Sequence, residues 1–207
     1  THLNLIKMTN ILSISHKIKK FNKKITVSGD KSLSIRWVLL ASQAIGSSKG
    51  YNLLMSEDVI ATLESIKRLG VKVILHRGVC EIFGNGINGF KYKNGLIINA
   101  KNSGTLGRLI LGLLIKSPKK IKILGDKSLS KRDFSRVTKP LKKFGAKFYY
   151  KKKNRLPLSI LGNPSPKGIN FIENKGSAQC KSSVMLAALN SSGTTSIKAK
   201  KSRNHSE

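Results

Sequence analysis

Residues 56–83 read SEDVIATLESIKRLGVKVILHRGVCEIF and carry a helix signal followed by two strand signals. Ser56 is a helix N-cap with acidic side chains directly after it, and Gly70 is a C-cap glycine at which the helix stops. Strand patterns then occupy residues 71–75 and 79–83, on either side of a short turn. The stretch therefore predicts a helix followed by a β-hairpin.

The same plan recurs downstream in residues 133–161. Residues 133–144 are expected to form a helix that Gly145 stops, and residues 146–150 and 157–161 are expected to form the strands after it. This alternation of helices and strands over the whole length is typical of the α/β (α+β) class and not of an all-α or all-β protein.

Two further elements are expected upstream of residue 56. Residues 24–28 predict the end of a strand, and residues 32–44 predict a helix. The apolar stripe of this helix is expected to consist of Leu33, Trp37, Leu40 and Ala44.

The chain contains an internal repeat. The string GDKSLS occurs at residues 29–34 and again at residues 125–130, and each copy is followed by one further residue and then arginine, which is Arg36 or Arg132. These copies lie 96 residues apart, whereas the two helices that end at glycine lie 75 residues apart. Two different offsets exclude a simple tandem duplication and indicate supersecondary units reused with different insertions.

Four segments place small polar residues and a basic residue at the start of a helical pattern: 29–36, 102–108, 125–132 and 176–181. A helix N-terminus offers free N–H groups and a partial positive charge, and Lys or Arg adds a full charge. One such loop is explained by ordinary helix capping. Four in one chain favour a ligand with more than one anionic group.

The charge of the chain is strongly positive, with 40 Lys and Arg residues against 9 Asp and Glu and a formal net charge of +31. A basic phosphate- or nucleic-acid-binding domain is one interpretation, because such a field attracts polyanions. Codon bias is the other, because 32 of the 40 basic residues are Lys and these are spread along the whole chain. Aromatic residues for stacking bases make up only 6%, so the sequence favours small anionic ligands over nucleic acid.

Several other classes of protein are excluded by the sequence. No apolar run approaches the ~18 residues of a membrane helix, so no membrane partner is expected. Cys80 and Cys180 form neither a disulfide framework nor a metal cluster, and they favour a reducing, cytoplasmic compartment. The four histidines lack metal-ligand spacing, and the Lys-Ser pairs lack the glycine pattern of a phosphate-binding P-loop.

Six segments in chain order carry a family resemblance. They read GDKSLSIRWVLLASQA, NSGTLGRLILG, GDKSLSKRDFSRVTKPLKKFGA, RLPLSILG, GSAQCKSSVMLAALNSSGTT and SRNHSE. At these segments the chain resembles the 5-enolpyruvylshikimate-3-phosphate synthase family, also called 3-phosphoshikimate 1-carboxyvinyltransferases, over about residues 20–207. The related UDP-N-acetylglucosamine enolpyruvyl transferases are a weaker match, because their catalytic cysteine loop is not visible here.

The resemblance implies a transferase of the shikimate pathway of aromatic amino acid biosynthesis. Its members move the enolpyruvyl group from phosphoenolpyruvate to the 5-hydroxyl group of shikimate 3-phosphate and release phosphate. The resemblance implies no metal and no organic cofactor, and a monomer is expected at full length. It also implies two domains, each built from three βαβαββ units.

Site residues follow from the resemblance. For shikimate 3-phosphate they are Lys31, Ser32, Arg36, Ser177, Ala178, Gln179, Ser202 and Arg203. For phosphoenolpyruvate they are Lys31, Asn102, Gly104, Arg132 and Gln179. Arg108 follows Asn102 at the family's spacing and is expected to support the loop.

The chain departs from the family pattern in length, because members are about twice as long. The resemblance therefore implies a fragment: residues 1–27 are a stub that belongs to the second domain, and residues 28–207 are a first substrate-binding domain with an incomplete third unit. The acid and base residues of the family lie in the other half, so this chain is expected to be inactive alone. Leu109 also stands where many members have proline.

Overall fold

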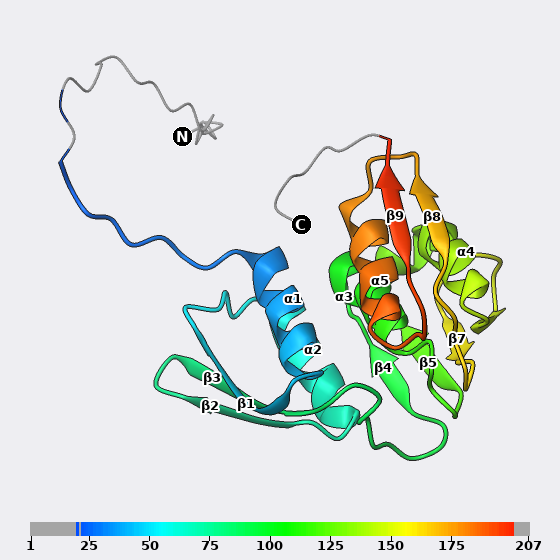
Figure 1. Cartoon of the computed structure of the whole chain (residues 1–207). Helices are drawn as coiled ribbons and strands as arrows, with labels where there is room; N and C mark the ends of the chain where they lie inside the picture. Colours follow the sequence, from blue (N-terminus) through cyan, green and yellow to red (C-terminus); the bar gives the residue numbers. More distant parts are fainter. Residues whose placement is uncertain (1–19, 21, 201–207) are drawn as a thin grey trace, which may run out of the picture.

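The computed structural model describes residue 20 and residues 22–200 and consists of consecutive α/β units (Figure 1). The first unit carries two helices and three strands. They are α1 (Lys31–Ala41), β1 (Ile45–Tyr51), α2 (Glu57–Arg68), β2 (Lys72–His76) and β3 (Val79–Asn85).

The second unit has the complete order βαβαββ. Its elements are β4 (Ile97–Asn99), α3 (Gly104–Leu113), β5 (Ile121–Leu124), the 3-10 turn η1 (Leu129–Lys131), α4 (Ser135–Lys143), β6 (Lys147–Tyr150) and β7 (Leu158–Leu161). The third unit reaches βαβ within the described residues, with β8 (Asn170–Glu173), α5 (Ala178–Ala188) and β9 (Ser196–Ala199). The expectation of repeated units with an incomplete third one is confirmed.

The strands form three small sheets. The first has the order β1-β3-β2 and is antiparallel throughout. The second has the order β4-β5-β7-β6, in which β4 runs parallel to β5 and the other pairs are antiparallel. In the third, β8 and β9 are parallel. Two consecutive parallel strands need a crossover connection. Helix α3 forms this connection between β4 and β5, and α5 forms it between β8 and β9.

The N-caps of corresponding helices recur at a nearly constant spacing along the chain. Asp30, Ser103 and Ser177 are the N-caps of α1, α3 and α5, at intervals of 73 and 74 residues, and each side chain accepts a hydrogen bond from the amide three residues later. Capping of this kind satisfies one of the orphan amides of a helix start. The three helices begin at the same end of the molecule, the upper end in Figure 1.

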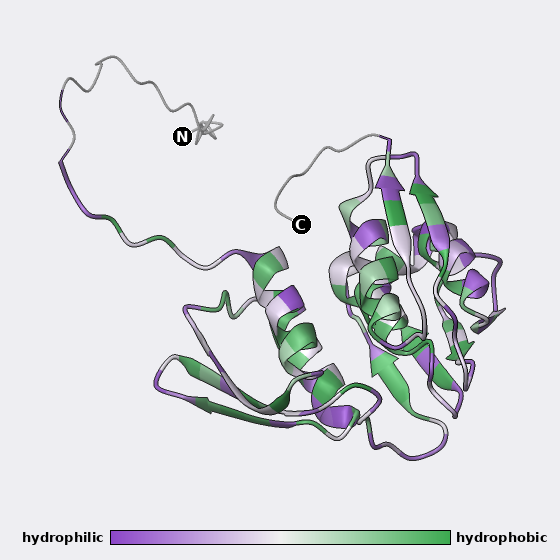
Figure 2. Cartoon of the chain, in the orientation of Figure 1, coloured by the Kyte–Doolittle hydropathy of each residue, from purple (hydrophilic) through white to green (hydrophobic). Residues whose placement is uncertain are grey.

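The core is centred on α3, where every residue except Arg108 is buried. Helix α5 lies against α3, and Gly112 makes this close approach possible: a Cβ atom there would lie 2.2 Å from the Ser183 carbonyl oxygen. Figure 2 shows hydrophobic residues along α5 and hydrophilic residues in many of the loops. Arg108, the one charged side chain on α3, is therefore notable, and it lies near the start of the helix.

Three predictions about the fold are wrong. Residues 24–28 form no strand, because no strand of the described chain pairs with their backbone; Ile25 and Val27 are each 68% exposed. The segment 125–132 begins no α-helix, since only the turn η1 forms before α4 starts at Ser135.

The buried face of α1 also differs from the prediction. Ile35, Val38 and Leu39 are buried, whereas Leu33 and Leu40 are half exposed. Helix α1 is apolar on two adjacent faces, and its packing against α2 selects the other one. The helix α2, the hairpin of β2 and β3, and the α4–β6–β7 segment form as predicted, within a residue or two at their ends.

Candidate functional site

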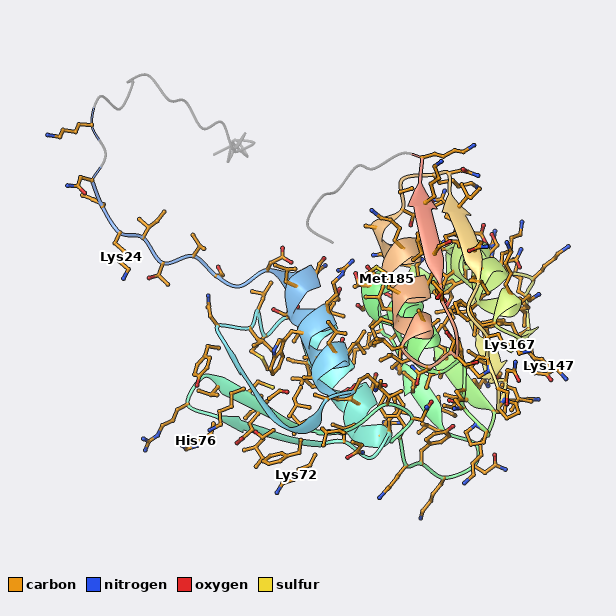
Figure 3. All side chains as sticks on the ribbon, viewed as in Figure 1. Lys24, Lys72, His76, Lys147, Lys167 and Met185 are labelled. Atoms are coloured by element: carbon orange, nitrogen blue, oxygen red, sulfur yellow. The ribbon has the colours of Figure 1, made fainter. Side chains whose placement is uncertain are left out.

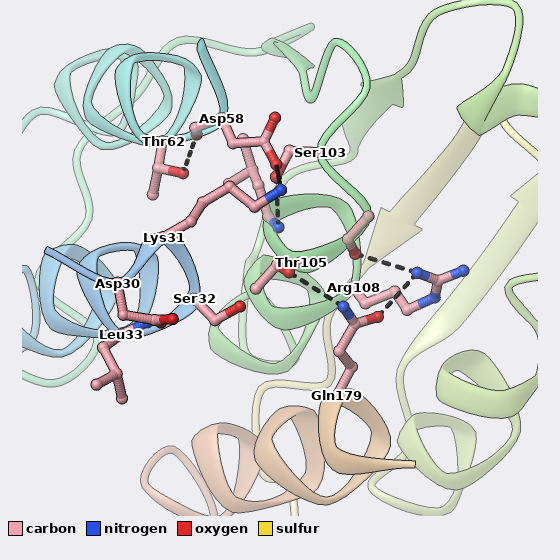
Figure 4. A network of polar contacts seen from close by, with 12 residues as sticks. Asp30, Lys31, Ser32, Leu33, Asp58, Thr62, Ser103, Thr105, Arg108 and Gln179 are labelled. Atoms are coloured by element: carbon pink, nitrogen blue, oxygen red, sulfur yellow. Dashed lines mark hydrogen bonds and ion pairs between the residues drawn. The ribbon is translucent and has the colours of Figure 1, made fainter. Parts of the chain in front are cut away.

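The starts of α1, α3 and α5 bring polar side chains together at one end of the fold. Figure 4 shows Lys31 and Ser32 from α1, Thr105 and Arg108 from α3, and Gln179 from α5 in one neighbourhood. Because each helix begins with a cap and unpaired amides, this end carries a positive potential before any side chain is counted. The repeated units therefore concentrate anion-binding groups at one place.

Lys31 is the first residue of α1 and points toward α2. Its Nζ atom lies 3.2 Å from Oδ2 of Asp58, a residue of the first turn of α2. The lysine side chain is 49% exposed, so its ammonium group remains accessible to a ligand while the ion pair fixes its direction. The sequence explained Asp58 by helix-start and surface roles and missed this contact.

Gln179 is held by two residues of α3. Arg108 donates from Nη1 to Gln179 Oε1 at 2.8 Å, and Gln179 Nε2 donates to Thr105 Oγ1 at 3.0 Å (Figure 4). Arg108 Nη1 also donates to the Gly104 carbonyl oxygen at 3.3 Å, and its guanidinium group lies 5.1 Å from the ring centroid of Phe134. These contacts give the carboxamide one orientation, with Oε1 toward the arginine.

A cavity of about 360 Å³ opens beside this network. It is lined by Arg108, Arg132, Asp133, Arg136, Ser177 and Gln179. The lining thus includes three guanidinium groups and one carboxylate, and planar guanidinium groups bind carboxylate or phosphate groups through two parallel hydrogen bonds. The cavity therefore has the charge and the donors for a small anion.

The surroundings of this cluster shift the pKa values of Arg108 and Asp133. Burial lowers the pKa of Arg108, and the guanidinium groups of Arg132 and Arg136 lower it further. Hydrogen bonds from Ser135, led by its hydroxyl group, lower the pKa of Asp133. Guanidinium groups this close together repel one another, so an anion that enters the cavity would relieve their mutual repulsion.

Gly104 permits the close approach of two arginines. A Cβ atom on it would lie 2.7 Å from Arg108 Nη1 and 3.2 Å from Arg132 Nη1. Of the residues expected on the phosphoenolpyruvate side, the structure thus brings together Gly104, Arg132 and Gln179. Asn102 is exposed and lies one residue before the N-cap of α3.

Arg36 lies in a different place from this cavity. Its Nη1 atom donates to the Ser32 carbonyl oxygen at 3.2 Å, and Nη2 lies 3.4 Å from Ser182 Oγ on α5. Burial lowers the pKa of Arg36, while Asp30 raises it to a smaller extent. The guanidinium group lines a mostly apolar cavity of about 200 Å³ whose other lining residues are Leu40, Leu109, Ser182, Met185, Leu186 and Leu189.

The remaining expected site residues are at the start of α5 and near the chain end. Ser177 is the N-cap of α5, and Ala178 and Gln179 are its first two residues. Ser202 and Arg203 lie outside the described residues. Sequence reasoning missed Thr105, Asp133 and Arg136; the signal that could have found Arg136 is its position one turn after Arg132.

Two structural features are absent from residues 20 and 22–200. No group of three or more His, Cys, Asp and Glu side chains there could hold a metal ion. In the same part of the chain, no helix has the length and apolar character needed to cross a membrane.

The repeated α/β units, of which the second is a complete βαβαββ unit, place capped helix starts beside a cavity lined by arginines and define an enolpyruvyl transferase-like fold. The sequence model of the family "EPSP synthase (3-phosphoshikimate 1-carboxyvinyltransferase)" matches residues 15–207 of this chain. The chain belongs to the EPSP synthase family.

Curated relatives agree with this assignment. A 3-phosphoshikimate 1-carboxyvinyltransferase of Ruegeria is 38% identical over 201 residues, which are 96% of this chain and 44% of the relative. That of Bacillus subtilis is 38% identical over 193 residues, 92% of this chain and 45% of the relative. The chain thus spans less than half the length of these relatives.

Solved structures share the fold. An EPSP synthase from Acinetobacter baumannii superimposes with a TM-score of 0.82 at 35% identity, over 88% of this chain and 42% of that one. The two chains are thus similar in sequence as well as in fold.

Proposed function

We propose that this chain supplies the anion-binding loops for enolpyruvyl transfer from phosphoenolpyruvate to the 5-hydroxyl group of shikimate 3-phosphate. In that reaction the hydroxyl oxygen loses its proton and bonds to the enolpyruvyl carbon, the bond from that carbon to the phosphate oxygen breaks, and inorganic phosphate leaves with the proton. The observation that carries the proposal is the cavity in which Arg132 meets the Arg108–Gln179 pair. Family membership supplies the substrates.

The two substrates divide the site residues between them. Shikimate 3-phosphate is assigned to the loops of α1 and α5, through Lys31, Ser32, Arg36, Ser177, Ala178 and Gln179, together with Ser202 and Arg203. Phosphoenolpyruvate is assigned to Lys31, Asn102, Gly104, Arg132 and Gln179. Gln179 belongs to both groups, and its fixed carboxamide lies beside the cavity where the two ligands would meet.

The domain assignment is part of the proposal. Residues 28–207 form a first substrate-binding domain, and residues 1–27 belong to a second one. Each ligand brings a phosphate and a carboxylate, so the cations of this chain neutralise charge on both. We further propose a cytoplasmic enzyme that is monomeric at full length.

Titration of the 207-residue chain with shikimate 3-phosphate tests the proposal. We expect saturable binding that Arg36→Ala weakens by about 1.5–3 kcal/mol, the usual value for a hydrogen bond to a charged group. Lys152→Ala is the control, because Lys152 lies in the exposed turn between β6 and β7. Absence of binding by a chain whose circular dichroism shows helix and strand would overturn the proposal.

A further inference from the structure

Glu173, the last residue of β8, is an acidic side chain in an unusual place. Only 4% of its surface is exposed, and among residues 20 and 22–200 it is the one charged residue that is buried. A carboxylate in such a position is costly unless hydrogen bonds replace its lost water. Its partners therefore indicate what it does.

Three consecutive backbone amides supply those partners. Oε1 of Glu173 accepts from the amide of Lys175 at 3.0 Å, and Oε2 accepts from the amides of Gly176 at 2.6 Å and Ser177 at 3.1 Å. The side chain thus closes a loop of four residues onto the end of its own strand. Gly176 has a φ of +65°, a backbone conformation that the closed loop requires and that glycine adopts without strain.

This loop leads directly into the proposed ligand site. Ser177 is both the last amide held by Glu173 and the N-cap of α5, where its hydroxyl oxygen accepts from the Cys180 amide at 3.3 Å. Ser177 and Gln179 line the cavity, and the loop that leads into them is therefore fixed at Glu173. The amide of Ser177 is committed to this carboxylate, so an anion in the cavity would be met by the Ser177 hydroxyl group and by the following amides.

We propose that Glu173 is a positioning residue for anion binding, which orders residues 175–177 and so presents the start of α5 to shikimate 3-phosphate. The inference rests on the proposed function, because it takes that ligand as the anion. Glu173 touches no substrate. It acts through the backbone of the loop and through Ser177.

The positioning role and simple electrostatics predict opposite changes in ligand affinity when Glu173 is replaced. A carboxylate near an anion site repels the ligand, so removal of the charge alone would tighten binding. Removal of the three hydrogen bonds frees the loop, which then loses conformational entropy when the ligand orders it, so binding weakens. Glu173→Gln removes the charge at nearly constant volume and leaves one acceptor oxygen, whereas Glu173→Ala removes both oxygens.

The experiment titrates the parent chain, Glu173→Gln, Glu173→Ala and Glu81→Gln with shikimate 3-phosphate. Amide resonances of Lys175, Gly176 and Ser177 are recorded by nuclear magnetic resonance at the same time. Glu81 lies on β3 and contacts Ser47 and Lys49, so its substitution changes the net charge equally without touching the loop. We expect about tenfold weaker binding for Glu173→Gln, a larger loss for Glu173→Ala, no loss for Glu81→Gln, and an upfield shift of the Gly176 amide proton in both Glu173 variants.

Each result decides a different point. Binding by the parent that is unchanged or tighter in Glu173→Gln overturns the positioning role and leaves the proposed function intact. Unshifted amide resonances in both Glu173 variants overturn it as well, because the hydrogen bonds would then not hold the loop. Absence of binding by a folded parent overturns the proposed function, and the inference falls with it.

Discussion

Arg108 and Gln179 form a hydrogen bond of 2.8 Å between α3 and α5, although 71 residues separate them along the chain. Arg108 is the one residue of α3 that is not buried, and Gln179 lies in the first turn of α5. The bond therefore joins the starts of two helices from different units. It also connects a residue expected only to support its loop with a residue expected to touch both ligands.

Arg108→Lys is expected to weaken phosphoenolpyruvate binding by about 1.5 kcal/mol, roughly tenfold, because a lysine ammonium cannot reproduce the planar fork that contacts Gln179 and Gly104. Competition titration measures the effect. Arg68→Lys is the matched control, since Arg68 donates to the Ile97 carbonyl oxygen on the outside of the fold. Equal affinity in Arg108→Lys and the parent would show that the carboxamide needs no such support.

Gly104→Ala is expected to weaken phosphoenolpyruvate binding while the free energy of unfolding changes little. The new Cβ atom would lie 2.7 Å from one guanidinium nitrogen and 3.2 Å from another, and both belong to flexible side chains that can move away. Their movement displaces the forks from the cavity, at a cost of about 1–3 kcal/mol in binding. Calorimetric titration and urea unfolding of the same sample separate the two effects. A large loss of stability would contradict the prediction.

The two segments in which a helix precedes a β-hairpin could be predicted from the sequence because their signals are local, whereas the strands β1, β4, β5, β8 and β9 were not predicted. Gly70 and Gly145 both adopt positive φ, 86° and 90°, where the sequence places the ends of α2 and α4. The two GDKSLS copies share a cap as well: Asp30 and Asp126 each accept from the amide three residues later. Only the first copy starts an α-helix, since the surroundings of a motif decide whether a turn continues.

What the sequence could not supply depends on packing between distant segments. The buried face of α1 was ambiguous because both of its candidate stripes are apolar, and contacts with other elements choose between them. The roles of Asp58 and Glu173 were hidden for the same reason. An acidic residue at a helix start or a strand end has an ordinary local explanation, and only the fold reveals that one holds Lys31 and the other a loop.

Gly112→Ala is expected to lower the free energy of unfolding by about 1–3 kcal/mol, because the added methyl group would lie 2.2 Å from the backbone oxygen of Ser183 and must push α3 and α5 apart. Gly107→Ala on the same helix is the control. Its Cβ would lie 3.5 Å from Ala100 and Phe134, an ordinary contact, and alanine favours the helix by up to about 1 kcal/mol. Urea denaturation of both variants measures the difference, and equal stabilities would contradict this view of the interface.

Cys180 is expected to resist alkylation at pH 8.5 until the protein unfolds. Burial, with a smaller effect of Glu173, raises the pKa of its thiol to about 11, and the thiol donates to the Arg136 carbonyl oxygen at 2.9 Å. Because the folded pKa lies above the unfolded one, the thiol contributes stability below about pH 8.5 that is lost as the pH rises toward 11. Iodoacetamide labelling with and without urea measures the protection, with Cys180→Ser as the assignment control.

Salt dependence is expected to separate a small-anion site from a nucleic-acid surface. Lysines project from separate parts of the molecule, as Lys24, Lys72 and Lys167 show in Figure 3. A single-stranded RNA contacted by the run 151–153 would lose affinity with a slope of about −0.7 per neutralised phosphate in a plot of log affinity against log salt. Alanine at all three positions would therefore flatten this slope by about 2.

Shikimate 3-phosphate, with one phosphate and one carboxylate, should show a shallow slope. The triple variant should leave that slope unchanged, whereas Arg36→Ala should alter it together with the affinity. Titrations of parent and variants with both ligands at two or more salt concentrations make the comparison. Tight, steeply salt-dependent RNA binding that the triple variant abolishes, with no affinity for shikimate 3-phosphate, would favour the nucleic-acid interpretation instead.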